Sequence, residues 1–359
     1  MDVSIIVPVY NVSPYIEECL RSVMNQSYHG SIECIIVDDV STDDSISIVN
    51  RMIATYHGAI EFQVLHHSHN RGLSAARNTG TIAAKGDYIY YLDSDDIITK
   101  DCIEILMNHV ESDPSVELIQ GNANAIPKMN SVNCNRHMII SHAIGNTDVR
   151  NCFYQTRQMI ETAWNKLIKR DFLICNNLLF KEGLLYEDIL WIFYMMKHLT
   201  NVHLEPQVTY IHRIRNGSIM RSTDCKKEIS HKREIYHEIF TNLTPGYENT
   251  ELFYFSKGIA LSYIRAIRNR PELKKDLSLY WSISRRNKNN KVCMILLFTR
   301  ILGMSRWGWI ILPLARRAIR PKLLSMDINK LFHKTHLYNF YQWHHKRKQV
   351  ELRGFEIYV

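Results

Sequence analysis

The sequence predicts an α/β fold: a Rossmann-like, mostly parallel β-sheet with flanking helices, followed by a helical C-terminal region. Apolar segments of strand character alternate with amphipathic helical segments through the first half of the chain, which is typical of βαβ units. Two strand segments, residues 33–37 and 88–92, end directly in acidic residues. Residues 225–290 have a helical pattern and no chemical motif. Because parallel strands end at one edge of a sheet, the acids are expected to lie together where such sheets bind ligands.

Composition and charge narrow the class of protein. The 359 residues are 46% hydrophobic, which is enough for a folded core. Eight cysteines without a C-x-x-C pair favour a reducing cytosol over a disulfide framework or a zinc site. Met1 leads into an apolar strand without the features of a signal peptide. The net charge of +8 is uneven, because from Lys291 onward there are 13 Lys and Arg against 3 Asp and Glu.

The first 115 residues alternate between strands and helices. The first helix is expected to begin with Ser13 as its N-cap and Pro14 at its first position. Small residues dominate the segment from Arg71 to Gly80, so a helix there is expected to pack closely. Strands are expected over residues 2–9, 33–37, 61–65 and 88–92, and helices over 14–25, 44–56, 71–80 and 99–111.

The second half of the chain is less regular. Residues 292–319 are apolar, but Arg300 and Arg306 interrupt them, so no charge-free piece approaches the ~20 residues of a membrane-spanning helix. This stretch fits a helix in the membrane interface or one packed on the core. Residues 121–150 are left open as a loop or a small hairpin. Strands are expected over 116–120 and 202–211, and helices over 164–170, 188–198 and most of 225–290.

Three carboxylates, Asp93, Asp95 and Asp96, follow the strand at 88–92. Clustered carboxylates repel each other unless a cation lies between them, and a divalent metal ion that also binds substrate phosphates is the usual solution. The alternative is a solvated turn that caps the next helix. The neighbouring strand ends in Asp38 and Asp39. The sequence contains neither G-x-G-x-x-G after the first strand nor G-x-x-x-x-G-K-[ST], which disfavours a dinucleotide site and a P-loop.

Six spaced motifs make the chain resemble family 2 glycosyltransferases of the GT-A fold, over roughly residues 2–220. The motifs are VSIIVPVYN at 3–11, IIVDDVSTDDS at 35–45, NRGLSAARNTG at 70–80, GDYIYYLDSDD at 86–96, LLYEDILW at 184–191 and YIHRIRNGSI at 210–219. The resemblance implies an enzyme that transfers a sugar from a nucleotide-diphosphate sugar, most often a UDP-sugar, to a hydroxyl with inversion. It also implies a divalent metal ion, Mn²⁺ or Mg²⁺.

The resemblance assigns roles to individual residues. Asp188 would be the general base, with Glu187 beside it. The metal ion would be held by Asp95, with Asp93 and His212 close to it. Pro8, Val9 and Tyr10 would line the pocket for the base of the nucleotide-sugar, and Asp39 would hydrogen-bond the base, typically uracil. The other residues that would bind the nucleotide-sugar are Arg71, Asp93, Ser94, Arg213 and Arg215.

Physical chemistry agrees with these roles. An inverting transfer needs a carboxylate that takes the proton of the attacking hydroxyl, and positive charge beside the departing diphosphate. Asp188 taken alone would be explained as an acid that favours a helix N-terminus. Together with the acidic motif and an arginine at 213 or 215, it is expected to be catalytic.

Two features depart from the family pattern or allow another interpretation. The loop after Asp39 usually reads DDGSTDGS but here reads DDVSTDDS. The branched Val40 disfavours the positive φ that glycine allows, so the base pocket is expected to be reshaped. The histidines at 66, 67 and 69 could form a metal cluster, although imidazoles beside a nucleotide site more often contact phosphate or solvent.

The chain is therefore interpreted as a glycosyltransferase domain, residues 1–220, with a donor half of about 1–115 and an acceptor half of about 116–220, followed by a helical, basic region, 221–359. The basic tail indicates the anionic inner leaflet as a partner, hence a cytoplasmic protein peripheral on the inner membrane. We expect a glycan or lipid-diphosphate-linked acceptor in capsule or other cell-surface polysaccharide synthesis.

Several alternatives remain open at this point. The tail could instead pack within the chain, and no nucleic-acid-binding module accompanies its basic residues. The alternative functions are a non-catalytic glycan-binding scaffold on the same fold and a nucleotidyltransferase. The latter would need a glycine-rich phosphate loop after the first strand, where the sequence reads PVYNVSPYI.

Overall fold

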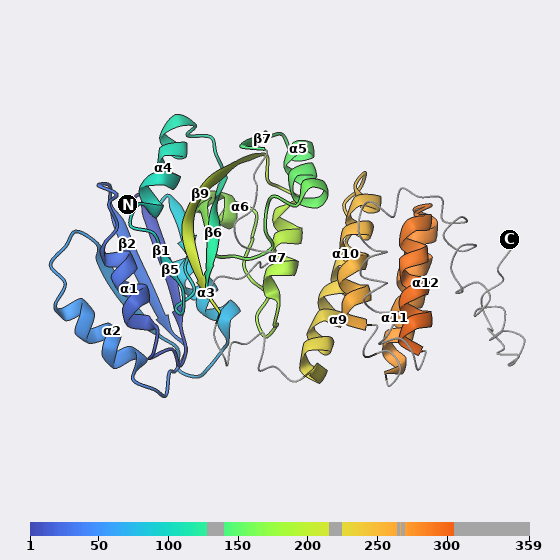
Figure 1. Cartoon of the computed structure of the whole chain (residues 1–359), viewed down its shortest axis with the longest axis horizontal. Coiled ribbons are helices and arrows are strands. Elements are labelled where there is room, and N and C mark those ends of the chain that lie inside the picture. Colours follow the sequence, from blue (N-terminus) through green and yellow to red (C-terminus); the bar gives the residue numbers. More distant parts are fainter. Residues whose placement is uncertain (128–139, 215–224, 264–265, 267–269, 305–359) are drawn as a thin grey trace, which may run out of the picture. The chain divides into compact units, whose positions relative to one another are not determined.

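The computed structural model describes residues 1–127, 140–214, 225–263, 266 and 270–304. The chain divides into two compact units, Met1–Glu251 and Leu252–Val359. The first unit contains the β-sheet, and the described residues of the second are mainly helical (Figure 1). The predicted boundary near residue 220 stays a prediction.

In Met1–Glu251, strands alternate with helices along the chain, from blue to yellow in Figure 1. The strands are β1 (Val3–Val9), β2 (Ile32–Asp38), β3 (Glu61–His66), β4 (Tyr88–Tyr91), β5 (Ile97–Ile98), β6 (Leu118–Ile126), β7 (His142–Ile144), β8 (Lys166–Lys169) and β9 (Asn201–Arg213). The helices are α1 (Ile16–Met24), α2 (Ser45–Ala54), α3 (Leu73–Ala83), α4 (Cys102–Ser112), α5 (Asn146–Asn151), α6 (Arg170–Cys175), α7 (Glu187–Met195) and α9 (Cys225–Thr241), with a short π-helix at Cys152–Thr156.

The sheet has the strand order β3-β2-β1-β4-β8-β6-β9-β5, and β7 also pairs with β9. Strands β3, β2, β1 and β4 are parallel neighbours. Strand β8 is antiparallel to both β4 and β6, and β9 is parallel to β6, so β4, β6 and β9 run in one direction. Strands β5 and β7 are short antiparallel additions to β9. The predicted mostly parallel α/β sheet with flanking helices is confirmed.

Helices cover both faces of strand β1, because successive side chains of a strand point to opposite faces. Val3, Ile5 and Val7 are fully buried in a hydrophobic cluster that also contains side chains of α1 and α4. Ile6 points to the other face, where α3 approaches so closely that a Cβ atom on Gly80 would lie 2.4 Å from Ile6 Cγ2. The close packing expected of this glycine-containing helix is therefore present.

The helix predicted over residues 164–170 is wrong. Residues 166–169 form β8, an interior strand between β4 and β6. Leu167 and Ile168 are both fully buried, because an interior strand covered on both faces needs apolar side chains on each side. An adjacent apolar pair between lysines does not distinguish this pattern from one helical turn.

Two predicted boundaries also need correction. The strand predicted over 116–120 continues to Ile126 as β6, with an irregular register against β9. Helix α1 begins at Ile16, and its N-cap is Tyr15 rather than Ser13. The reason is a turn in which the Val12 oxygen accepts hydrogen bonds from the backbone nitrogens of both Tyr15 and Ile16.

The unit that begins at Leu252 is helical in its described residues, as expected. It contains the end of α10 (Glu248–Tyr263), then α11 (Pro271–Arg286) and α12 (Asn290–Met304). Helix α11 has proline at its first position and buries Leu273, Leu277 and Tyr280. Within the described ranges, no helix is both long enough and apolar enough to cross a membrane. The basic tail from 305 onward lies outside the described residues, so its membrane contact stays a prediction.

Candidate active site

The residues that the sequence singles out lie at one edge of the sheet. Strands β1, β2 and β4 are parallel neighbours, and Tyr10, Asp39 and Asp93 follow their carboxyl ends. Strand β9 runs in the same direction as β4 and ends at Arg213. Open α/β sheets bind their ligands at this edge. The fold therefore brings together motifs that are far apart in the sequence.

Arg77, which the sequence analysis did not single out, joins three of the predicted site residues. Its side chain lies on α3 and is only 1% exposed. Nη2 donates a hydrogen bond to Asp93 Oδ1 at 2.8 Å. Nη1 donates to Glu187 Oε1 at 2.8 Å and to Asp188 Oδ1 at 2.9 Å. The acidic motif and the start of α7 are thus linked through one buried guanidinium.

One buried guanidinium faces three carboxylates, and burial shifts the pKa values of two of them, Glu187 and Asp188. Burial, together with the negative charge of Asp188, raises the pKa of Glu187 to about 7. Burial also raises the pKa of Asp188, although Arg77 opposes the shift. Burial alone would lower the pKa of Arg77, but the three carboxylates outweigh it and keep the guanidinium charged. Asp188 therefore has an increased proton affinity, which suits a general base.

A second group of side chains forms around Asp96, which is 1% exposed. Asp96 Oδ2 accepts a hydrogen bond from Tyr210 at 2.7 Å and lies 3.1 Å from His212 Nδ1. Asp96 Oδ1 accepts a hydrogen bond from the backbone nitrogen of Arg213 at 2.6 Å. Burial raises the pKa of Asp96 to about 6, although His212 opposes the shift. Asp96 therefore fixes the end of β9 beside the acidic motif.

The acidic edge has the composition of a site for a hard divalent cation. Asp93 and Asp95 are partly exposed, unlike Asp96, and Arg213 Nε donates to the backbone oxygen of Asp95 at 3.1 Å. Carboxylate oxygens are the ligands that Mg²⁺ and Mn²⁺ prefer. The chemistry of this donor set therefore fits the predicted metal ion, and the assignment of Asp95, Asp93 and His212 as its ligands stays a prediction.

Asp39 follows β2 and contacts the loop before α3. Its side chain is 4% exposed. Its Oδ1 lies 2.7 Å from His67 Nδ1 and accepts a hydrogen bond from the backbone nitrogen of Arg71 at 2.8 Å. Its Oδ2 accepts from the nitrogen of Gly72 at 2.7 Å. Gly72 has φ 87°, a conformation that favours glycine. Asp39 thereby positions the start of the helix that carries Arg77, and its role towards a base stays a prediction.

The other residues predicted around the nucleobase differ in exposure. Pro8 and Val9 are the last two residues of β1 and are buried, whereas Tyr10 is 49% exposed. An exposed tyrosine ring at this edge is available to stack on a base. Ser94 is buried within the acidic motif.

Two of the predicted arginines form ion pairs at the surface. Arg71 Nη2 donates to both carboxylate oxygens of Glu182, at 2.9 and 3.1 Å. Arg213 Nη2 pairs with Glu18. Exposed ion pairs of this kind are weak, so either guanidinium can exchange its partner for a phosphate. Arg215 lies outside the described residues.

Val40 adopts a left-handed backbone conformation with φ 65°, so the expectation that this branched residue would avoid positive φ is wrong. The adjacent turn is held by a hydrogen bond from the backbone nitrogen of Ser41 to Asp38 Oδ1 at 2.8 Å. Tyr186, the residue before α7, is left-handed as well, with φ 66°. Such strained residues persist where their surroundings fix them, and they cluster at functional sites.

Trp164 connects the Arg77 group with the Asp96 group. Its ring stacks on that of Tyr210, with centroids 4.6 Å apart, and lies parallel to that of His212 at 5.6 Å. The backbone nitrogen of the preceding residue, Ala163, donates to Asp188 Oδ2 at 3.1 Å. This role of Trp164 was not predicted, because residues 164–170 were expected to form a helix.

Among the described residues, the histidines at the end of β3 and directly after it have separate protein partners rather than a shared metal site. Both ring nitrogens of His67 are engaged, Nδ1 with Asp39 and Nε2 with Thr79 Oγ1 at 2.8 Å. His66 Nδ1 lies 3.0 Å from Asp38 Oδ2. These imidazoles stabilise the loop that leads into α3.

Comparison with known families decides the class of this domain. The model for Glycosyl transferase family 2 matches residues 4–175, from β1 to α6. These residues belong to glycosyltransferase family 2. The family 2 domain contains the acidic motif and Arg77, whereas Asp188 and Arg213 follow the matched residues.

Relatives of this family 2 domain include glycosyltransferases from several bacteria. Glycosyltransferase GlyA of Streptococcus pneumoniae serotype 4 is 32% identical over 235 residues, which cover 61% of this chain and 31% of GlyA. An uncharacterised glycosyltransferase of Escherichia coli K12, YibD, is 26% identical over 283 residues, which cover 75% of this chain and 80% of YibD. The chain thus spans less than a third of GlyA's own length.

The fold of the family 2 domain has a solved counterpart. Residues 1–349 of S. aureus TarS, crystallised in complex with UDP-GlcNAc, superpose with a TM-score of 0.69 and 20% identity, over 86% of this chain and 92% of that one. The GT-A fold that the motifs predicted is therefore confirmed.

Proposed function

We propose that this chain is an inverting glycosyltransferase that moves a sugar from a nucleotide-diphosphate sugar to a hydroxyl of a glycan or lipid-linked oligosaccharide. The observation that carries the proposal is the Arg77 group, which links the acidic motif to Asp188, a carboxylate with a raised pKa. Family membership and the fold shared with UDP-GlcNAc-bound TarS support it. A UDP-sugar is the first donor to test.

Asp188 acts as the general base in this proposal. Arg77 donates to its Oδ1 and the nitrogen of Ala163 to its Oδ2, so the orientation of the carboxylate is fixed. It takes the proton of the acceptor hydroxyl while that oxygen bonds to the sugar and the bond to the diphosphate breaks. Glu187, with a pKa of about 7, holds its proton more tightly than an ordinary glutamate. It therefore competes less for the charge of Arg77.

The donor would lie along the carboxyl edge of the sheet. The exposed ring of Tyr10 would stack on the base, and Arg71 and Arg213 would exchange their exposed carboxylate partners for phosphate oxygens. Asp95, with Asp93 and His212, would hold Mn²⁺ or Mg²⁺. Such an ion, when bound, neutralises charge on a departing diphosphate.

The proposal includes a location and an acceptor, for which the support comes from the sequence. The excess of basic residues from Lys291 onward favours an anionic membrane surface. We therefore place the chain in the cytoplasm, peripheral on the inner membrane. There it would act on a lipid-diphosphate-linked oligosaccharide or a growing glycan of a capsule or another cell-surface polysaccharide.

Labelled-sugar transfer tests this function. UDP-, GDP-, dTDP- and CDP-sugars are offered with acceptors extracted from membranes, to the wild type, Asp188→Asn and the control Asp171→Asn, which changes an exposed acid on α6. The wild type and the control transfer sugar. Asp188→Asn loses ~10²- to 10⁴-fold in turnover, and calorimetry finds its donor affinity unchanged.

The other outcomes distinguish the alternatives. Unchanged turnover by Asp188→Asn would remove this residue from the mechanism. Transfer of the nucleoside monophosphate to an acceptor, with release of sugar 1-phosphate instead of a nucleoside diphosphate, would indicate a nucleotidyltransferase. Donor binding without transfer by the wild type, for every donor and acceptor, would favour a glycan-binding scaffold.

A further inference from the structure

A cluster of metal-ligating side chains lies at the end of the sheet opposite the candidate active site. Asp113 is the C-cap of α4, His142 opens β7, and His203 lies near the start of β9. Strand β9 runs from this cluster to His212, and a strand rises by about 3.3 Å per residue. The cluster is therefore separate from the acidic motif, on the order of 30 Å away along the strand.

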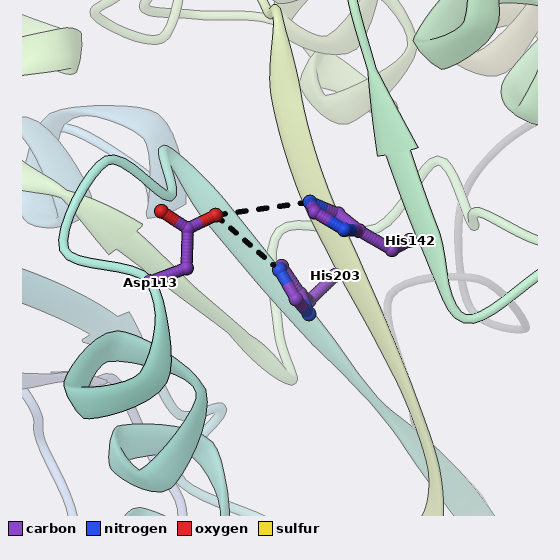
Figure 2. Close-up of side chains that lie close together, drawn as sticks. All are labelled: Asp113, His142 and His203. Atoms are coloured by element: carbon purple, nitrogen blue, oxygen red, sulfur yellow. Dashed lines mark ion pairs between the residues drawn. The ribbon is translucent and has the colours of Figure 1, made fainter.

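The three side chains bring one ligand atom each close together, as Figure 2 shows. Asp113 Oδ2 lies 3.7 Å from His142 Nε2 and 3.6 Å from His203 Nε2. Both separations exceed the length of a direct hydrogen bond. Two atoms bound tetrahedrally to one zinc ion at ~2.1 Å are ~3.4 Å apart. The observed separations are thus close to those around a single metal ion.

Neighbouring groups orient the carboxylate and leave one imidazole nitrogen unsatisfied. Asp113 Oδ1 accepts hydrogen bonds from the nitrogen and hydroxyl of Ser115, and Oδ2 accepts from Asn201 Nδ2 at 2.7 Å. Outer contacts of this kind hold metal ligands in place. His203 Nε2 is buried and has no hydrogen-bond partner in the described part of the chain. A buried polar atom without a partner is uncommon, and a metal ion would satisfy it.

Binding requires one rearrangement, in His142. The rings of His142 and His203 are opposite each other on β7 and β9 and stack with centroids 3.8 Å apart. His142 Nε2 also lies 2.8 Å from Asn201 Oδ1. The ring has to turn about its Cβ–Cγ bond for both Nε2 lone pairs to meet one ion, and it gives up the contact with Asn201. The His142 side chain is 31% exposed, so part of it borders solvent rather than packed side chains.

We propose that Asp113, His142 and His203 bind one zinc ion, with water in its remaining coordination position. Two imidazoles and a carboxylate favour Zn²⁺ over Mg²⁺, which prefers oxygen ligands only. The ion joins the end of α4 to β7 and β9, and holds the three-residue β7 on the edge of the sheet. Its distance from the acidic motif makes its role structural.

Zinc binding by the metal-free, untagged full chain tests the proposal. Equilibrium dialysis against Zn²⁺ is carried out in excess Mg²⁺, which occupies carboxylate sites such as the acidic motif, and the melting temperature is followed in parallel. The wild type binds about one zinc ion per chain and its melting temperature rises with zinc. His142→Ala and His203→Ala each bind zinc at least ~10-fold more weakly, and their melting temperatures do not respond.

The control variant is His57→Ala, which removes an exposed imidazole outside the cluster and keeps wild-type zinc binding. Circular dichroism without zinc verifies that each variant is folded, and either histidine variant suffices if the other misfolds. Absence of zinc binding by the wild type, displacement of the bound zinc by Mg²⁺, or unchanged binding by a folded histidine variant would each overturn the proposal. Because no readout depends on turnover, this result is independent of the proposed glycosyltransferase activity.

Discussion

At the scale of single residues, Arg77 determines how the candidate site is assembled. Its guanidinium is the shared partner of Asp93, Glu187 and Asp188, which come from two distant motifs. Removing a buried charge leaves its partners unpaired and strongly destabilises a protein. Arg77 is therefore a positioning residue, and Asp188 depends on it for both orientation and charge.

Glu187→Gln is predicted to flatten the pH dependence of stability. In the folded chain the pKa of Glu187 is raised from 4.5 to about 7. The folded state therefore binds the proton more tightly than the unfolded state, and this group makes stability fall as pH rises from about 4.5 to about 7. The free energy of unfolding, measured with urea, should fall between pH 5 and pH 8 in both proteins. The fall should be smaller in the variant than in the wild type, by on the order of 1 kcal/mol.

The control for this experiment is Glu61→Gln, which changes an exposed glutamate on β3 and should leave the wild-type pH dependence in place. An identical loss of stability in the wild type and in Glu187→Gln would mean that Glu187 is ionised in the folded protein throughout this range.

The sequence indicated the acidic residues of the candidate site, but it did not indicate Arg77, the buried cation that pairs with them. Asp93, Asp95 and Asp188 stand out because carboxylates interrupt or follow apolar segments. Arg77 lies in a helix among alanines, and a physical signal was present: an arginine on a face of small, buried residues needs buried partners. Which carboxylates those are depends on the packing of α3 and α7, which one sequence does not provide.

At the scale of elements, the contact of α3 with β1 sets the position of Arg77. Gly80 lies against Ile6, which is fully buried, and leaves no room for a methyl group. Alanine favours a helix over glycine by about 1 kcal/mol. Overpacking a buried contact costs about 1–3 kcal/mol. In a change of Gly80 to alanine the two effects oppose each other. The sign of the resulting change in the free energy of unfolding therefore shows whether the contact with Ile6 is tightly packed.

Gly80→Ala is predicted to destabilise the protein by about 1 kcal/mol, measured by urea unfolding, because the contact with Ile6 outweighs helix propensity. The matched variant on the same helix is Ile82→Ala, whose side chain is 66% exposed and whose effect should stay within about 0.5 kcal/mol. A stabilised Gly80→Ala variant would show that α3 can move away from β1 without loss.

Strand β8 is an element that the sequence did not allow us to predict. The alternating elements of the first 115 residues were predicted because each is a βα unit with a clear period. Residues 166–169 are too short to carry a period, and their strand identity comes from neighbours β4 and β6, which are distant in sequence. The same error hid Trp164, which lies two residues before the strand and stacks on Tyr210.

At the scale of the whole molecule, the family 2 domain is acidic, with 13 Lys and Arg against 20 Asp and Glu in residues 4–175, and the basic excess lies towards the other end of the chain. Residues 305–359 contain 11 Lys and Arg against 3 Asp and Glu. Each basic residue near an anionic leaflet contributes about 1 kcal/mol to binding. The tail is therefore expected to control where the chain is located rather than the proposed transfer reaction.

Deletion of residues 305–359 is predicted to lower binding to vesicles of anionic phospholipid by at least ~10-fold, measured by co-sedimentation, while nucleotide affinity stays unchanged. Binding of the full chain should weaken with added salt and be low on vesicles of neutral phosphatidylcholine. Equal sedimentation of the full and truncated chains would mean that the tail packs within the chain instead.

Nucleotide binding by the wild type and by Asp95→Ala tests the central claim, a metal-dependent donor site at the carboxyl edge of the sheet. Calorimetry with UDP, GDP, dTDP and CDP, each with and without Mn²⁺, should show one preferred nucleotide that binds only with the metal. Asp95→Ala should bind it at least ~10-fold more weakly. Absence of binding by the wild type for all four nucleotides, or an affinity that neither Mn²⁺ nor Asp95→Ala changes, would contradict the account.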